Sequence, residues 1–94
     1  MPRSRKKNND YVTLYHATNM SAANSIDYEG FRRGIGGRQG SAVYLDATPN
    51  EAKAHSRNGR SVVYAVTVKR SDCTYDGASY AVHNENAIRS YRRD

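Results

Sequence analysis

Hydrophobic and polar positions alternate in several segments of the chain, and this period of two predicts strands. The segment "YVTLYHAT" (11–18) is rich in β-branched and aromatic residues, so it predicts a strand that ends near His16. The segment "SVVYAVTVK" (61–69) is the most apolar of the chain and predicts a central strand. Shorter strands are predicted for "AVYLD" (42–46) and "SYAVHN" (79–84).

A first helix is predicted for "MSAANSIDYEGF" (20–31). Ser21 can cap its start, and Ile26 would face the core. Gly30 stands where a helix end often needs a left-handed residue, and Phe31 can then fold back onto Ile26.

A second helix is predicted to begin at "TPNE". Thr48 supplies an N-cap, Pro49 the first helical position and Glu51 a capping-box partner, and the helix should run to about Ser56. The segment "RSDCTYDGA" (70–78) is predicted to be a turn region. Strands and helices in this mixed order predict an α+β fold.

The length of 94 residues is enough for one domain, predicted over 11–94, after a disordered basic arm over 1–10. The net charge is +6, with "PRSRKK" opening the chain and "RSYRRD" closing it, and this charge favours polyanionic partners such as RNA or DNA. A solvated tail that aids solubility is an equal alternative for the arm. Eight tyrosines and no tryptophan suit a half-buried cleft, or strand positions in an ordinary core.

A single cysteine, Cys73, excludes an intramolecular disulfide and is compatible with a reducing compartment. The sequence shows no apolar leader and no long apolar run, so we expect an intracellular protein, cytoplasmic or nuclear, that does not contact a membrane. We also expect a monomer.

The sequence lacks the motifs of zinc sites, nucleophile elbows, P-loops and dinucleotide-binding turns. The three histidines, His16, His55 and His83, have no paired spacing, so no metal site is predicted. The glycine-rich segment "GIGGRQG" (34–40) matches neither a P-loop nor a dinucleotide-binding turn, and it is predicted to form the mobile lip of a cleft. There is no nucleophile elbow, although a Ser/His/Asp triad stays open.

Five segments occur in an order that matches a known family. They are "LYHAT", "AANSIDYEGFR", "GSAVYLDATPNEAKAH", "VVYAVTV" and "SYAVHNENAI". Between about Leu14 and Tyr91 the chain resembles the catalytic domain of poly(ADP-ribose) polymerase-like ADP-ribosyltransferases. The resemblance implies two small packed β-sheets flanked by two short helices, with His16 and Tyr44 on adjacent strands. It also implies NAD as substrate and no metal.

The resemblance assigns roles to individual residues. His16 falls on the histidine that binds the adenosine ribose, and Ala17 replaces the glycine whose backbone binds the nicotinamide amide. Tyr44 falls on the tyrosine that stacks on nicotinamide, and His55 on an aromatic position at the other face of that ring. Ala52 stands where polymerases carry a serine. The NAD-contacting residues implied in this way are His16, Ala17, Thr18, Gly40, Ser41, Tyr44, Ala52 and His55.

Ser79 occupies the place of the family's catalytic glutamate, so the implied catalytic set is His16, Tyr44 and Ser79. Glu85, six residues further along the same strand, would lie about 20 Å away and cannot replace it. The resemblance therefore implies transfer of one ADP-ribose to a protein or nucleic-acid acceptor, or an inactive member, rather than polymer synthesis.

Two further functions stay open at this point. One is the related NAD-dependent RNA 2′-phosphotransferase, for which Arg32, Arg33 and Arg38 are available. The other is a non-catalytic module that binds NAD, ADP-ribose or nucleic acid through the basic arm and the arginine-rich loop.

Overall fold

The strands in the described part of the chain form two small antiparallel sheets. A computed structural model describes residues 10–32, 42–55 and 62–94. The first sheet has the order β1-β3-β6 and the second the order β2-β5-β4. The elements are β1 (Tyr11–Thr18), α1 (Met20–Glu29), β2 (Val43–Leu45), α2 (Pro49–His55), β3 (Val62–Lys69), β4 (Cys73–Tyr75), β5 (Tyr80–Val82) and β6 (Ile88–Arg93), with 3-10 turns η2 (Arg70–Asp72) and η3 (Glu85–Ala87).

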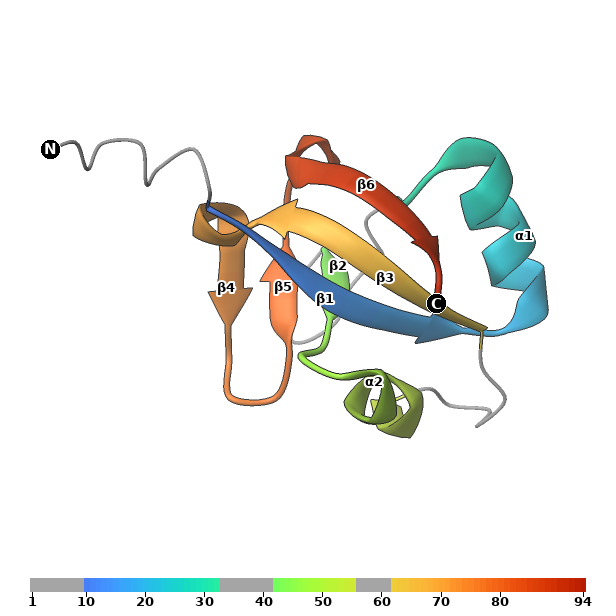
Figure 1. The fold of residues 1–94 in the computed structure, drawn as a ribbon, viewed down its shortest axis with the longest axis horizontal. Coiled ribbons are helices and arrows are strands. Elements are labelled where there is room, and N and C mark those ends of the chain that lie inside the picture. The colour runs from blue at the N-terminus through green and yellow to red at the C-terminus, as the bar shows by residue number, and fades with distance from the viewer. Residues whose placement is uncertain (1–9, 33–41, 56–61) are drawn as a thin grey trace, which may run out of the picture.

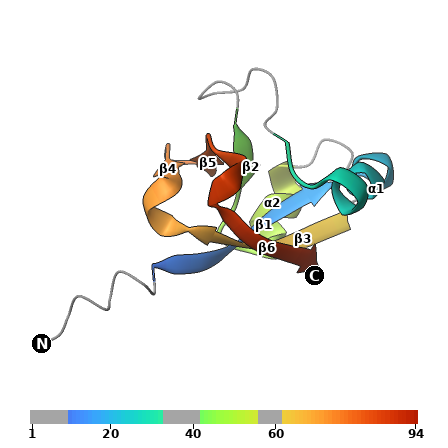
Figure 2. The same ribbon diagram turned by 90° about the horizontal axis from the view of Figure 1, so that it is seen from above.

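Among the described residues, one backbone bridge joins the two sheets, between β1 and the residue after β2. Tyr15 and Asp46 each donate an amide hydrogen to the carbonyl of the other, at 2.7 Å in both directions. The strands of the second sheet run across those of the first, α1 lies at one end of the first sheet, and α2 lies below β1 (Figures 1 and 2). The predicted α+β class, with two small sheets and two short helices, is confirmed.

Strand β3 is central in the first sheet, as its apolar sequence predicts. Val66 and Val68 are fully buried and Tyr64 is 1% exposed. Each fully buried side chain of this size contributes roughly 1.5–3 kcal/mol relative to an exposed one. The core therefore depends on β3 more than on any other strand, with residues from β1, α1, β2 and β5 packed around it.

The start of α1 differs from the prediction. Asn19, not Ser21, is the N-cap: its backbone is extended, and its side-chain oxygen accepts from the amide of Ala22 at 2.8 Å. A cap residue must lie outside the helix, and Ser21 is already within the first turn.

The end of α1 agrees with the prediction only in part. Gly30 does end the helix and donates to the Ile26 carbonyl at 2.8 Å. Its φ of 88° is positive as expected, but its ψ of 178° is extended rather than left-handed helical. This conformation directs Phe31 into the core cluster that also contains Ile26.

The start of α2 follows the prediction. The Thr48 hydroxyl accepts from the Glu51 amide at 3.1 Å, and Pro49 is the first helical residue. The helix is described as far as His55, and the predicted end at Ser56 lies outside the described residues.

Two strands were not predicted. The segment predicted as a turn region, 70–78, contains η2 and the edge strand β4. The basic end of the chain forms β6, an edge strand that pairs with β3 and has a register shift between Thr67 and Val68. The predicted basic arm, apart from Asp10, and the glycine-rich segment 34–40 lie outside the described residues.

Candidate functional site

An open cavity of about 390 Å³ lies between α1, the end of β1 and β2. Its volume falls within the range of about 300–1,000 Å³ that is usual for small-molecule sites. Three of the residues implied by the resemblance line it, namely His16, Thr18 and Tyr44. Phe31 and Arg32 line it as well.

The His16 ring is fixed by a main-chain bond. Its Nδ1 lies 3.0 Å from the carbonyl oxygen of Tyr44, and a carbonyl can only accept, so Nδ1 carries the hydrogen. Phe31 packs edge-on against the ring, with centroids 5.3 Å apart. Burial lowers the pKa of His16 below its ordinary value, against smaller opposing effects of the Tyr44 carbonyl and the Asp46 charge. At neutral pH the ring is uncharged, and Nε2 is a hydrogen-bond acceptor.

Tyr44 contributes to the site in two ways. Its carbonyl holds His16, and its half-buried side chain lines the cavity. The residue is paired with Ala81 of β5, so its main chain is fixed by the second sheet. The cavity thus joins a neutral histidine from β1 and an aromatic ring from β2.

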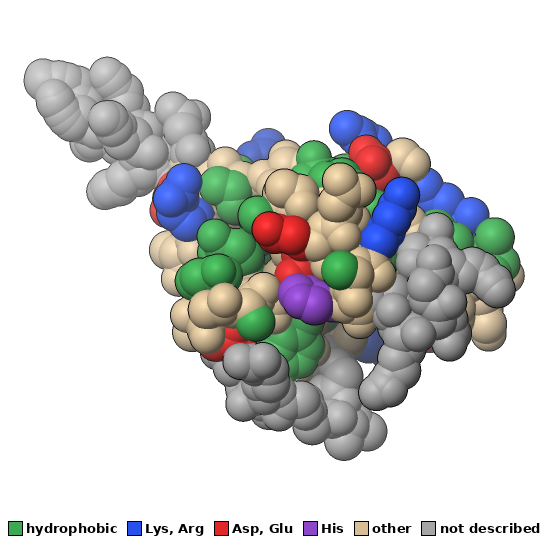
Figure 3. All heavy atoms as spheres, turned by 90° about the horizontal axis from the view of Figure 1, so that it is seen from below, with side chains coloured by type: hydrophobic (Ala, Val, Ile, Leu, Met, Phe, Trp, Pro, Cys, Tyr) green, Lys and Arg blue, Asp and Glu red, His purple; other side chains and the backbone are tan. Residues whose placement is uncertain are grey.

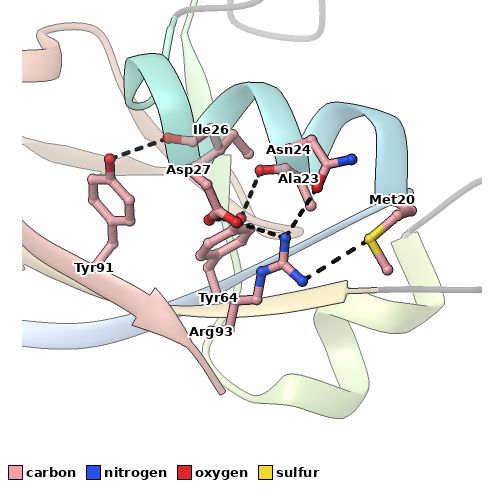
Figure 4. A network of polar contacts seen from close by, with 8 residues as sticks. All are labelled: Met20, Ala23, Asn24, Ile26, Asp27, Tyr64, Tyr91 and Arg93. Carbon is pink, nitrogen blue, oxygen red and sulfur yellow. Dashed lines mark hydrogen bonds and ion pairs between the residues drawn. The ribbon is translucent and has the colours of Figure 1, made fainter.

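The helical wall of the cavity is fastened to β3 and β6 by the polar network in Figure 4. The Tyr64 hydroxyl lies 2.6 Å from Asp27 Oδ1 and 2.9 Å from the Ala23 carbonyl. Arg93 Nη2 lies 2.6 Å from the other oxygen of Asp27, and Tyr91 donates to the Ile26 carbonyl at 3.2 Å. The bond from the Tyr64 hydroxyl and the neighbouring Arg93 lower the pKa of Asp27, against a smaller effect of desolvation, so this carboxylate stays charged at neutral pH.

Other implied residues lie outside the lining of this cavity. Ala17 pairs with Val63 in the first sheet, and Ala52 is buried in α2. His55, at the end of α2, has its Nδ1 2.9 Å from Asp46 Oδ1. The structure thus pairs His55 with Asp46, and it does not place His55 opposite Tyr44 across this cavity.

Ser79 is buried just before β5. Its amide donates to Asp76 Oδ1 at 3.0 Å, and its carbonyl accepts from the Asp76 amide at 3.2 Å. Leu45 and Tyr80 are the last pair between the antiparallel strands β2 and β5. Asp46, which comes after Leu45, and Ser79, which comes before Tyr80, are therefore the next residues beyond this pair. Gly40, Ser41, Arg33 and Arg38 lie outside the described residues.

Sequence reasoning missed Asp46. Its side chain is 6% exposed, and its carboxylate bonds a histidine nine positions later in the chain. The available signal was an acidic residue at the end of an apolar strand, because a buried carboxylate there needs a partner.

Within the described residues, no group of three or more His, Cys, Asp or Glu side chains is placed to hold a metal ion. No helix in the described ranges is long and apolar enough to span a membrane. No family model matches the chain, and a search of curated proteins finds no significant match.

Proposed function

We propose that this protein is an NAD-dependent mono-ADP-ribosyltransferase with an ADP-ribosyltransferase-like fold, and that the cavity between α1, β1 and β2 is part of its NAD site. The observation that carries the proposal is the neutral His16, bonded to the carbonyl of Tyr44 beside the Tyr44 side chain. These two residues are the ones on which the family resemblance depends most.

The chemistry of the cavity supports this assignment. With Nδ1 committed to the Tyr44 carbonyl, Nε2 of His16 can accept a hydrogen bond from a ribose hydroxyl. The Tyr44 ring offers a flat apolar surface on which nicotinamide can stack. Arg32, at the rim, supplies a cation for the pyrophosphate, although it also forms an exposed ion pair with Glu29 at 3.1 Å.

The reaction breaks the bond between nicotinamide and ribose through an oxocarbenium-like transition state. Positioning of the two reacting groups supplies much of the rate in such a step. Ser79, in the place of the family glutamate, offers no carboxylate to activate the hydroxyl of an attached ADP-ribose, and this favours a single transfer over chain growth.

The first test is NAD binding, measured by the shift in melting temperature and by calorimetric titration. Saturating NAD should stabilise the parent, because a ligand at 100 times its Kd adds about 2.7 kcal/mol to the free energy of unfolding. Tyr44→Ala removes the ring but keeps the carbonyl that holds His16. An aromatic stack is worth about 0.5–1.5 kcal/mol, so the Kd for NAD should rise about two- to thirteen-fold.

Tyr28→Ala is the matched control, because Tyr28 lies on α1 but is 89% exposed and does not line the cavity. This variant should bind NAD like the parent. If the parent does not bind NAD, or if Tyr44→Ala binds it equally well, the proposal is wrong.

The second test is mass spectrometry of the protein and candidate acceptors after incubation with NAD. A single added ADP-ribose is expected, and Ser79→Glu should raise NAD hydrolysis or transfer. Polymer formation by the parent would contradict the assigned role of Ser79.

A further inference from the structure

Asp46 and His55 form a carboxylate–imidazole pair to which the proposed function has so far given no role. The Asp46 side chain is 6% exposed, the His55 side chain is 51% exposed, and Asp46 Oδ1 lies 2.9 Å from His55 Nδ1. An ionised carboxylate can only accept, so Nδ1 of His55 carries the hydrogen. In the neutral ring, Nε2 is then the proton acceptor. A buried carboxylate that orients a half-exposed imidazole is the arrangement by which proteins fix the tautomer of a histidine base.

The main chain holds this pair in place at both ends. Asp46 is bonded through its amide and its carbonyl to Tyr15 of β1, and the Thr48 cap starts α2 two residues later. Helix α2, which carries His55, lies against β1. Figure 3 shows the face on which α2 lies, with a histidine side chain at the surface beside acidic side chains.

The pair is connected to the proposed NAD site through the main chain, and neither of its side chains lines the cavity. Asp46 follows Tyr44 by two residues, and its bridge partner Tyr15 directly precedes His16. Burial lowers the pKa of His16, and the Tyr44 carbonyl and, to a smaller extent, the charge of Asp46 oppose this effect. Ser79 directly precedes β5, whose first residue, Tyr80, pairs with Leu45, the residue before Asp46. A serine hydroxyl is a poor proton acceptor at neutral pH, whereas an imidazole is a good one.

We infer that His55 is the general base for transfer to the first acceptor and that Asp46 is its positioning residue. This inference rests on the proposed function. As the acceptor oxygen bonds to C1′ of the ribose, the bond from C1′ to the nicotinamide nitrogen breaks, and its electron pair leaves with neutral nicotinamide. The proton of the acceptor hydroxyl moves to Nε2 of His55 and then to solvent. With water as acceptor, the products are ADP-ribose, nicotinamide and one proton.

The experiment measures nicotinamide release from NAD by the full chain, with kcat and KM determined separately. His55→Gln keeps a polar side chain but removes the base. We expect kcat to fall about 10²–10⁴-fold, because general base catalysis usually raises the rate by that factor. KM should stay within about twofold, since ground-state binding depends on other residues. Asp46→Asn should also lower kcat, because an amide can hold the ring in the wrong tautomer.

Lys53→Gln is the matched control, because Lys53 is an exposed residue of the same short helix. It should release nicotinamide at the parent rate. His55→Ala should recover part of the lost kcat when free imidazole is added, whereas Lys53→Gln should not respond to imidazole.

A second readout does not depend on turnover. Nitrogen-15 NMR of the imidazole should show His55 with its hydrogen on Nδ1 in the parent, and a loss of this preference in Asp46→Asn. His55→Gln keeps the test decisive if Asp46→Asn does not fold, because His55 is half exposed and its replacement leaves the buried positions unchanged.

The outcomes separate this inference from the proposed function. If NAD produces no melting shift in the parent, the proposed function fails, and the general base fails with it. If NAD binds but the parent releases no nicotinamide, the transferase activity fails, and the general base fails with it. If the parent releases nicotinamide and His55→Gln keeps the parent kcat, only the present inference is overturned. A hydrogen on Nε2 rather than Nδ1 of His55 in the parent would overturn it as well.

Discussion

Gly30 is the position at which the shape of the cavity wall depends most directly on backbone conformation. It ends α1 with φ 88° and ψ 178°, donates to the Ile26 carbonyl, and lines the cavity together with Phe31. This region of the backbone map is essentially restricted to glycine. We therefore expect Gly30→Ala to destabilise the fold and to weaken NAD binding.

The magnitude follows from what a Cβ atom at this position would meet. Its nearest neighbour would be the Tyr91 hydroxyl oxygen at 3.6 Å, which is an ordinary van der Waals contact. Steric overlap thus contributes little, and the cost is backbone strain of about 1–3 kcal/mol. Alanine also reduces the conformational entropy of the unfolded chain relative to glycine, and this offsets about 0.4–1 kcal/mol of the lost stability. With the middle value of each range, the net loss is about 1.3 kcal/mol, which corresponds to a fall in Tm of about 5–10 °C for a domain of this size.

The assay is thermal and urea denaturation at fixed pH, followed by titration with NAD. Gly77→Ala is the matched control: Gly77 also has a positive φ, 96°, but lies in the turn between β4 and β5, with no neighbouring atom within 4 Å of an added Cβ. Both variants should lose stability, and only Gly30→Ala should lose NAD affinity. A Gly30→Ala variant as stable as the parent would refute the reasoning from backbone strain.

Three further outcomes are expected. Asn19→Ala should lower the free energy of unfolding by about 0.5–2 kcal/mol through loss of the cap, whereas Ser21→Ala should leave it nearly unchanged; equal effects in urea denaturation would contradict the assignment of the cap. Burial holds the pKa of His16 below its unfolded value of about 6.5, so the unfolded state binds more protons as the pH falls. The contribution of His16 to the free energy of unfolding is therefore fully present above that pH and is lost as the pH drops below it. His16→Gln should have a weaker pH dependence than the parent in denaturation at pH 7.5 and 5.5. Deletion of residues 2–7 should flatten the salt dependence of any RNA or DNA binding, and an unchanged slope would show that the arm makes no phosphate contacts.

The elements that the sequence predicts correctly carry local signals. Strand β3 is apolar over nearly its whole length, and α2 begins with a capping threonine, a proline and a glutamate. Each of these signals acts within a few residues, so no knowledge of the tertiary structure is needed to recognise it.

The errors arise where a tertiary neighbour decides the outcome. Strand β6 contains three arginines and only two core-facing apolar residues, Ile88 and Tyr91, so its sequence resembles a charged tail. Its pairing with β3, and the contact of Arg93 with Asp27 on α1, make it a strand. The sequence close to β6 predicts neither its pairing with β3 nor the contact between Arg93 and Asp27.

The candidate site also combines features that the sequence predicts with features that depend on tertiary contacts. The order of the motifs predicts that His16 and Tyr44 are neighbours, but it cannot predict that a main-chain carbonyl of Tyr44 holds the His16 ring. The pairing of His55 with Asp46 depends on the path of the chain between β2 and α2. A flat ring at the end of a helix is compatible both with stacking and with a carboxylate partner, and the sequence alone does not separate the two.

The position of the candidate site follows from the lack of a continuous backbone ladder between β1 and β2 in the described residues. In a continuous sheet, β1 and β2 would be joined by a full ladder, and the donors and acceptors at their facing edges would be used by the backbone. Here the described residues form a single bridge between them, at Tyr15 and Asp46, and beyond it the Tyr44 carbonyl accepts from a side chain, the His16 ring. The split therefore opens a cavity and at the same time supplies the main-chain group that fixes its histidine. Because Asp46 is itself the bridging residue, the carboxylate that orients His55 is held in place through its main chain. In a chain of 94 residues with a thin core, a split of this kind can position a histidine, an aromatic ring and a carboxylate–imidazole pair without a third layer of structure.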